Sequence, residues 1–172
     1  MIYKMSENGE GGVFYNKMFW LSPNPFFASL VQGLYAGEQG KLLSFLQFSY
    51  FSYNLAPFGD PLSRVFERIA TDDLAHVKIL AEMLVMLGEK PLATANGKLL
   101  SLRNIRPETD KSSMLLTAIE IKENSIINLK TAISKIDNRY IKNALTRILN
   151  EETYSLNSLK NSTKNELSIP PP

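Results

Sequence analysis

One stretch of the chain combines a carboxylate and an imidazole at helical spacing. Asp73 and His76 are three residues apart, and residues at that spacing share one face of a helix. His76 is the only histidine in the sequence, and both residues interrupt an otherwise apolar stripe. A polar group buried without a partner is costly, so these side chains must pair with other groups, bind something or reach water. The stripe comprises Leu62, Val65, Ile69, Asp73, His76, Leu80, Met83 and Leu87.

Three further apolar stripes are interrupted in the same way. Lys41 interrupts the rows of the first helical segment, and Lys122 interrupts the stripe of the third. Glu152 and Ser155, again three residues apart, interrupt the stripe of the last segment. If the four helices face one another, these groups meet in one layer in which two lysines balance two carboxylates. We therefore predict an ion-pair layer made of Lys41, Asp73, His76, Lys122, Glu152 and Ser155.

The composition is typical of one soluble globular domain. The chain has 172 residues, of which 44% are hydrophobic, and a formal net charge of +2. It has no basic run, so neither nucleic acid nor an anionic membrane is expected as a partner. It has no cysteine, which excludes disulfides and thiolate metal sites. No segment reads as a signal peptide or a membrane span, so we expect a cytoplasmic protein. Glu120 and Glu151 are interpreted as solvated.

Capping and breaking residues predict where the helices begin and end. Asn24 followed by Pro25, and Asp60 followed by Pro61, each combine an N-cap with a proline in the first turn. Gly88 is typical of the residue that follows a helix. The first predicted helix runs from Pro25 to about Tyr53, and the second runs from Pro61 to near Gly88. The third runs from Ser112 or Ser113 to near Asp137, where a tight turn leads to the fourth, which ends at about Asn161.

The long connection between the second and third helices determines the topology. At about 3.3 Å per residue, the connection from Gly88 to Ser112 can travel the full length of a bundle. The third helix then runs parallel to the second, and two antiparallel pairs are joined by one crossover. This arrangement is an all-α, ferritin-like four-helix bundle with one long crossover between helices 2 and 3. We predict an irregular N-terminal arm over residues 1–22, the bundle over residues 23–161 and a flexible tail over residues 162–172.

Several segments resemble the manganese-catalase and rubrerythrin-like branch of the ferritin-like superfamily. In the dinuclear proteins of this superfamily, two helices each supply a Glu and the other two each supply a Glu-x-x-His pair. Asp73 and His76 match one such pair, with a shortened carboxylate. The matching segments are Gly40 to Leu42, Gln47 to Tyr50, Arg68 to His76, Ala81 to Met83, Leu87 with Gly88, Asn96 to Lys98, Asp137 with Asn138, and Arg147 to Glu152.

The chain departs from the pattern of this family at three ligand positions. The resemblance implies a Glu at two positions where the chain has Lys41 and Lys122, and a His where the chain has Ser155. A charged lysine has donors but no lone pair for a metal. We therefore predict a degenerate dinuclear site in which the lysines substitute for the metals, with no cofactor. A non-catalytic structural or interaction role follows, and the resemblance permits association with a bacterial spore coat.

Two other interpretations of the same residues stay open. In the first, Glu38, Asp73, His76 and Glu152 bind Fe or Mn, and the chain is an oxidoreductase acting on peroxide or oxygen through a reduced site. This interpretation requires Lys41 and Lys122 to point away from the layer or to extend to the surface. In the second, the lysines are accessible and unpaired, and the layer binds an anionic small molecule.

The first helix is apolar on nearly every side. A helix of this kind is covered on more than one face. We therefore predict a homodimer through its aromatic face, with covering by the N-terminal arm as the alternative. The apolar residues are Leu42, Leu43, Phe45, Leu46, Phe48, Tyr50, Phe51 and Tyr53.

Overall fold

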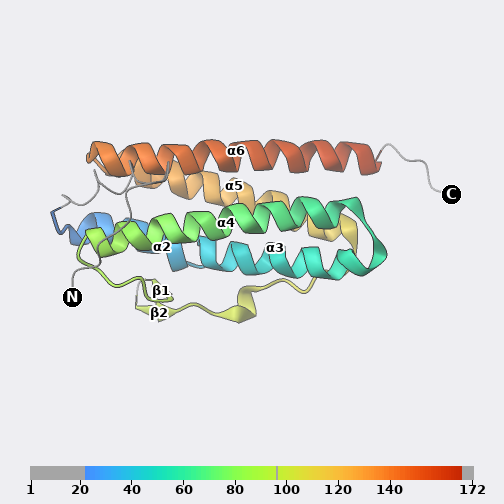
Figure 1. Ribbon diagram of the computed structural model, residues 1–172, viewed down its shortest axis with the longest axis horizontal. Helices are drawn as coiled ribbons and strands as arrows, with labels where there is room; N and C mark the ends of the chain where they lie inside the picture. Colours follow the sequence, from blue (N-terminus) through green and yellow to red (C-terminus); the bar gives the residue numbers. More distant parts are fainter. Residues whose placement is uncertain (1–21, 96, 168–172) are drawn as a thin grey trace, which may run out of the picture.

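The computed structural model describes residues 22–95 and 97–167, with side chains as far as residue 162. Its helices lie side by side in one bundle, which confirms the all-α, ferritin-like prediction (Figure 1). Residues 1–21 of the predicted N-terminal arm and the last five residues of the predicted tail lie outside the described residues. The helices are α2 (Pro25–Ala36), α3 (Lys41–Leu55), α4 (Pro61–Met86), α5 (Lys111–Lys135) and α6 (Arg139–Leu167), with a 3-10 turn η1 (Ala56–Phe58) between α3 and α4.

Side-chain caps fix the starts of α2 and α4, as the sequence predicts. The Asn24 carboxamide oxygen accepts a hydrogen bond from the backbone N–H of Phe27 at 3.0 Å. The Asp60 carboxylate accepts one from the backbone N–H of Leu62 at 2.9 Å. Each cap satisfies a backbone donor that the first turn of a helix leaves unpaired. Asp110 caps α5 in the same way, so that helix begins slightly before the predicted serines.

The first predicted helix is broken in two, which corrects the prediction of one helix to Tyr53. Gly37 has an extended backbone and ends α2, and the extended Gly40 precedes α3. A Cβ atom on Gly37 would lie 2.4 Å from the Gly33 carbonyl oxygen. One on Gly40 would lie 2.9 Å from the Tyr35 carbonyl oxygen. Only glycine permits these close approaches, so the break depends on residue type at both ends.

Helix α6 is longer than predicted, because it continues past Asn161 to Leu167. The sequence between these residues contains neither glycine nor proline, and the first proline of the tail is Pro170. Nothing in the sequence stops the helix at Asn161.

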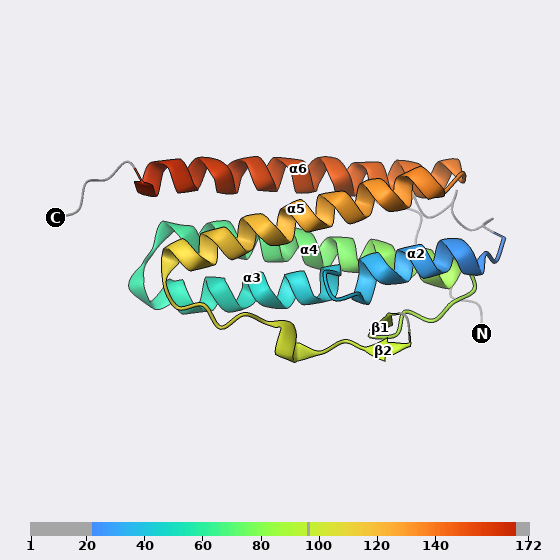
Figure 2. The ribbon, with the colours of Figure 1, turned by 180° about the vertical axis from the view of Figure 1, so that it is seen from behind.

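The connection from α4 to α5 carries structure that the sequence analysis does not predict. It contains a two-stranded antiparallel hairpin of β1 (Thr94–Ala95) and β2 (Lys98–Leu99), followed by a 3-10 turn η2 (Leu102–Asn104). Gly97 at the turn of the hairpin has φ of 74°, a value that favours glycine. Figure 2 shows the connection running along the bundle beside α2 and α3. Helix α5 therefore begins at the same end as α4, as predicted.

Hydrogen bonds hold this crossover against the helices. The Gln47 side chain donates to the Arg106 carbonyl oxygen at 3.0 Å and accepts from the Arg106 N–H at 2.7 Å. Arg106 in turn donates two hydrogen bonds, of 2.6 and 2.7 Å, to the Glu120 carboxylate. Glu120 is thus exposed, as the sequence predicts, and it is also paired with Arg106. Nearer the start of the crossover, the Gln32 amide donates to the carbonyl oxygens of Leu92 and Thr94.

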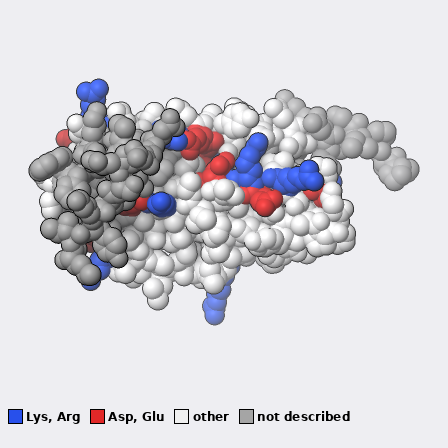
Figure 3. All heavy atoms as spheres, in the orientation of Figure 1, with Lys and Arg blue, Asp and Glu red and all other residues white. Residues whose placement is uncertain are grey.

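The core consists of two apolar clusters near opposite ends of the bundle. The first joins α2 to the C-terminal half of α4, the end of α5 and the start of α6. The second joins α3 to the start of α4, the start of α5 and the end of α6. Among the described residues, no helix is long and apolar enough to cross a membrane. Figure 3 shows lysine, arginine and acidic side chains intermixed on the face that α4 and α6 present.

A buried ion-pair layer as candidate functional site

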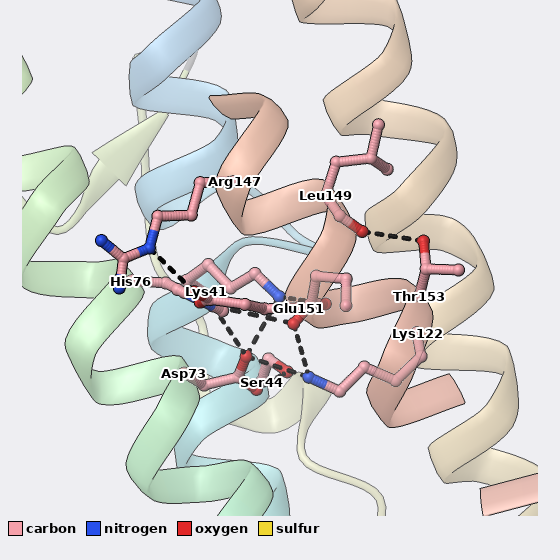
Figure 4. A network of polar contacts seen from close by, with 10 residues as sticks. Lys41, Ser44, Asp73, His76, Lys122, Arg147, Leu149, Glu151 and Thr153 are labelled. Carbon is pink, nitrogen blue, oxygen red and sulfur yellow. Dashed lines mark hydrogen bonds and ion pairs between the residues drawn. The ribbon is translucent and has the colours of Figure 1, made fainter. Parts of the chain in front are cut away.

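Between the two apolar clusters, four helices each contribute charged or titratable side chains to one buried layer (Figure 4). Lys41 is the first residue of α3, whereas Asp73 and His76 lie near the middle of α4. Lys122 and Glu152 lie near the middle of α5 and α6. None of the five is more than 3% exposed. The structure thus brings together five of the six residues predicted for the layer, and we call these five the ion-pair layer.

Each ammonium group of the layer contacts both carboxylates. Lys122 Nζ lies 3.0 Å from Asp73 Oδ1 and 2.9 Å from Glu152 Oε1. Lys41 Nζ lies 3.0 Å from Asp73 Oδ1 and also forms an ion pair with Glu152 Oε2. Two positive and two negative charges therefore alternate around a closed ring. Because all four groups are buried, each charge depends on its neighbours rather than on water.

Asp73 accepts hydrogen bonds from more than the two lysines. The Ser44 hydroxyl donates to Asp73 Oδ2 at 2.5 Å. Burial by itself raises the pKa of Asp73, but the charges of Lys122 and Lys41, together with the nearby His76 and the hydrogen bond from Ser44, hold it well below its usual value. Asp73 is therefore ionised throughout the neutral range.

Lys122 is held as an ammonium group by its surroundings. Burial alone lowers the pKa of Lys122, but the charges of Asp73 and Glu152 and the hydrogen bonds to them outweigh burial and raise it. The ammonium nitrogen also lies 4.9 Å from the centroid of the Phe48 ring, where the electrons of the ring face attract a cation. Lys122 carries a full positive charge at neutral pH.

His76 connects the layer to the surface. Its Nε2 lies 2.7 Å from Glu151 Oε2, and Glu151 also accepts a hydrogen bond from Arg147 at 2.9 Å. Burial raises the pKa of Glu151, but the hydrogen bonds from His76 and Arg147 lower it on balance. Glu151 is thus only part-exposed, and its pairing with His76 and Arg147 is not predicted by its interpretation as solvated. Figure 4 shows Arg147 and Glu151 extending this network beyond the ion pairs.

The other ring nitrogen of His76 faces the ion pairs without a partner. His76 Nδ1 lies 3.7 Å from both Asp73 Oδ1 and Glu152 Oε1, beyond hydrogen-bonding distance. It is buried and has no hydrogen-bond partner among the described residues. Glu152 Oε2 also makes no regular hydrogen bond, but it is paired with Lys41. His76 Nδ1 is therefore the unsatisfied atom of the layer.

Two predicted site residues lie outside the layer. Glu38 is exposed in the break between α2 and α3, so the alternative metal site that includes it is not assembled. Ser155 is buried one turn after Glu152, but the layer's hydrogen bonds do not include it among the described residues. Glu123, which follows Lys122, is exposed and pairs with Lys160 at 2.7 Å.

Sequence reasoning missed two residues that bond directly to members of the ion-pair layer, Ser44 and Glu151. Ser44 carries a usable signal, because it lies one turn after Lys41 on the buried row of the first helical segment. Glu151 carries none, because it lies off the apolar stripe of α6 and reaches His76 from the margin of the bundle.

The donor atoms of the layer resemble a metal site, but the lysines already fill the cation's role. The ligand atoms of Asp73, His76 and Glu152 lie within 4.8 Å of one another. Two carboxylates and an imidazole suit iron or manganese. Both carboxylates, however, are paired with ammonium groups that have no lone pair to offer a metal. As they stand, these residues do not fit a pair of metal ions.

Comparison with known proteins places this geometry in a family. The sequence profile of the family described as manganese containing catalase matches residues 20–129. Two crystal structures have the same fold. One is of KatB, a manganese catalase from Anabaena PCC7120, with a TM-score of 0.79, and the other is of wild-type KatB, a manganese catalase from Anabaena, with a TM-score of 0.78. Each is 16% identical in sequence, and the match covers 87% of this chain and 77% of that one. No curated protein sequence matches. The chain belongs to the manganese-containing catalase family.

Proposed function

We propose that the chain is a cytoplasmic, non-catalytic member of this family, with a structural or interaction role. Its di-metal site is replaced by the ion-pair layer. The observation that carries the proposal is the position of Lys122 Nζ, which lies 3.0 Å from Asp73 and 2.9 Å from Glu152. The two carboxylates that would bind a metal are neutralised by groups that belong to the chain.

The balance of charge explains why a metal does not simply join the lysines. The carboxylates of the layer carry two negative charges, and Lys41 and Lys122 cancel both. A divalent cation would enter a buried site that already contains two positive charges, where repulsion is only weakly screened. Redox chemistry on peroxide, which needs the metal, is then absent from the native chain.

A second candidate function is supported by one observation. The ligand atoms of Asp73, His76 and Glu152 are close together, and His76 Nδ1 has no hydrogen-bond partner among the described residues. This arrangement favours a single Fe or Mn ion and an oxidoreductase acting on peroxide or oxygen. Glu38 does not add a fourth ligand in this arrangement, because it is exposed in the break before α3.

Metal content decides between the two candidates. The purified chain is incubated anaerobically with Fe(II) or Mn(II), desalted and measured by mass spectrometry, and oxygen release from peroxide is followed in parallel. The ion-pair layer predicts less than about a tenth of an equivalent of either metal and no oxygen release. One equivalent that disappears in Glu152→Gln would instead establish the metal-dependent candidate.

We also propose that the chain forms a homodimer through the aromatic face of α3. Phe45 and Tyr50 pack only partly against the core, and the Tyr53 side chain is 75% exposed. Light scattering should give twice the mass of one chain, and Tyr53→Lys should shift the mass towards one chain. Tyr154→Lys, which changes a tyrosine 67% exposed on α6, is the matched control and should leave the dimer intact. A monomeric native chain would refute this proposal.

A further inference from the structure

Three donor atoms of the layer are grouped beside Lys122, and one of them, Asp73 Oδ1, is also contacted by Lys41. Asp73 Oδ1 and Glu152 Oε1 lie 3.0 and 2.9 Å from Lys122 Nζ. The same two oxygen atoms each lie 3.7 Å from His76 Nδ1. The two oxygens and the nitrogen thus form one three-atom face, and the Lys122 ammonium group is bound to its two oxygens.

Hydrogen bonding determines what His76 Nδ1 offers to this face. His76 Nε2 lies 2.7 Å from Glu151 Oε2, and this carboxylate, which also accepts a hydrogen bond from Arg147, has only acceptor oxygens to offer. His76 Nε2 must therefore carry the hydrogen of the bond to Glu151. In the neutral ring, Nδ1 then carries a lone pair directed into the layer. A carboxylate that orients the far nitrogen of an imidazole in this way is the usual support of a histidine that binds a metal.

Lys41 relates to the carboxylates differently. It pairs with Asp73 Oδ1 and with the other oxygen of Glu152, Oε2. Glu152 Oε1, the oxygen nearest His76 Nδ1, is left to Lys122. The two lysines are therefore not equivalent, although each has the same charge.

We propose that Lys122 is the residue that keeps a divalent cation off the face formed by Asp73 Oδ1, Glu152 Oε1 and His76 Nδ1. This proposal rests on the proposed function, in which the native chain binds no metal. One carboxylate oxygen from each of two helices and one imidazole nitrogen suit Mn²⁺, Fe²⁺ or Co²⁺. Without the Lys122 ammonium group, the two carboxylates face only Lys41, and a cation is the group that restores the balance of charge.

The test compares two variants that remove the same charge from different places. Lys122→Met should bind about one equivalent of Mn(II), or of Co(II) as a coloured probe, with an affinity at least about 100-fold above that of the native chain. Metal binding should raise the melting temperature of Lys122→Met. Adding His76→Phe to this variant should lower its affinity for the metal at least about tenfold. Lys41→Met is the matched control and should bind no metal at this face, because Lys122 remains on it. Calorimetric titration and metal analysis give stoichiometry and affinity, and circular dichroism confirms that each variant is folded.

Metal binding by the Lys122 variants tests the inference, whereas metal binding by the native chain tests the proposed function. Lys122→Met that is folded and binds no Mn(II) or Co(II) overturns the inference, and so does equal binding by Lys41→Met. If Lys122→Met does not fold without metal, Lys122→Gln, whose neutral amide still donates to the carboxylates, is titrated instead, and its failure to bind is equally decisive. Metal bound by the native chain would refute the proposed function itself, so the two failures are distinguishable.

Discussion

The substitution Lys122→Met removes one charge from the centre of the bundle and leaves the shape of the side chain nearly intact. Lysine and methionine have similar helix propensities and similar unbranched stems, so α5 itself should be little affected. What disappears is the ammonium group that contacts Asp73 and Glu152 and lies 4.9 Å from the Phe48 ring. The variant therefore isolates the role of the charge.

The expected loss of stability is large because the partners stay buried. Asp73 and Glu152 are 0% exposed, so neither can turn to water when Lys122 is gone. Removing one partner of a buried pair typically costs about 3–5 kcal/mol, since it leaves an uncompensated charge. We expect a loss in this range in the free energy of unfolding at neutral pH.

Urea denaturation followed by circular dichroism measures the loss. With a slope of about 2 kcal/mol per molar urea, a loss of 4 kcal/mol moves the midpoint down by about 2 M. The melting temperature should fall by about 10 °C for a chain of this size. Lys130→Met, at an exposed position of the same helix, is the matched control and should stay within about 0.5 kcal/mol of the native chain.

A second substitution tests the cause. Lys122→Met combined with Glu152→Gln leaves one carboxylate, Asp73, opposite one ammonium group, Lys41. We expect this double variant to recover about half of the lost stability, because the surplus negative charge is gone. A loss below about 1 kcal/mol in Lys122→Met, or no recovery in the double variant, would refute the view that Lys122 is buried and paired.

Three further predictions concern pH and the elements that surround the layer. The pKa of Asp73 lies well below its usual 3.8, and the pKa of Lys122 lies above its usual 10.5. Urea denaturation at a series of pH values should therefore show that both groups contribute fully to the free energy of unfolding between pH 3.8 and 10.5. Stability should fall as pH drops below 3.8 through the depressed pKa of Asp73, and again as pH rises above 10.5 through the raised pKa of Lys122. Gly40→Ala should cost about 1–3 kcal/mol, seen as a lower urea midpoint, because its Cβ meets the backbone at the end of α2. Gln47→Leu should cost about 1–3 kcal/mol and speed proteolysis within the crossover, because both hydrogen bonds to the Arg106 backbone are lost; an unchanged cleavage rate would contradict this role.

The bundle and most of its polar layer follow from two simple properties of the sequence. Residues at steps of three and four share a helix face, so the positions of Asp73, Lys122 and Glu152 on buried stripes are readable without a structure. Buried charges require partners, so stripes with opposite charges at mid-length predict ion pairs between helices. The capping residues Asn24 and Asp60 predict the helix starts for an equally local reason.

The features that the sequence does not predict depend on contacts between distant parts of the chain. The apolar rows continue through Gly37 and Gly40, so only the close approach of the backbone at these glycines reveals the break. The short hairpin of the crossover is held by Gln32, which lies some 60 residues away. Glu151 joins the network because its side chain reaches across to His76 from another helix, and no periodicity encodes such a reach.

The distribution of charges in the layer also favours one alignment of the α3–α4 hairpin against the α5–α6 hairpin. The hairpin of α3 and α4 supplies Lys41 and Asp73, and the hairpin of α5 and α6 supplies Lys122 and Glu152, so each hairpin gives the layer one positive and one negative charge. The contacts from Lys41 to Glu152 and from Lys122 to Asp73 form only when the halves are aligned. The apolar clusters on either side tolerate many alignments, because apolar packing is not directional. If one hairpin were shifted along the other by one helical turn, about 5.4 Å, these charges would lie among apolar side chains without their partners. The layer thus penalises misaligned pairings of the two hairpins, and it does so without a metal ion.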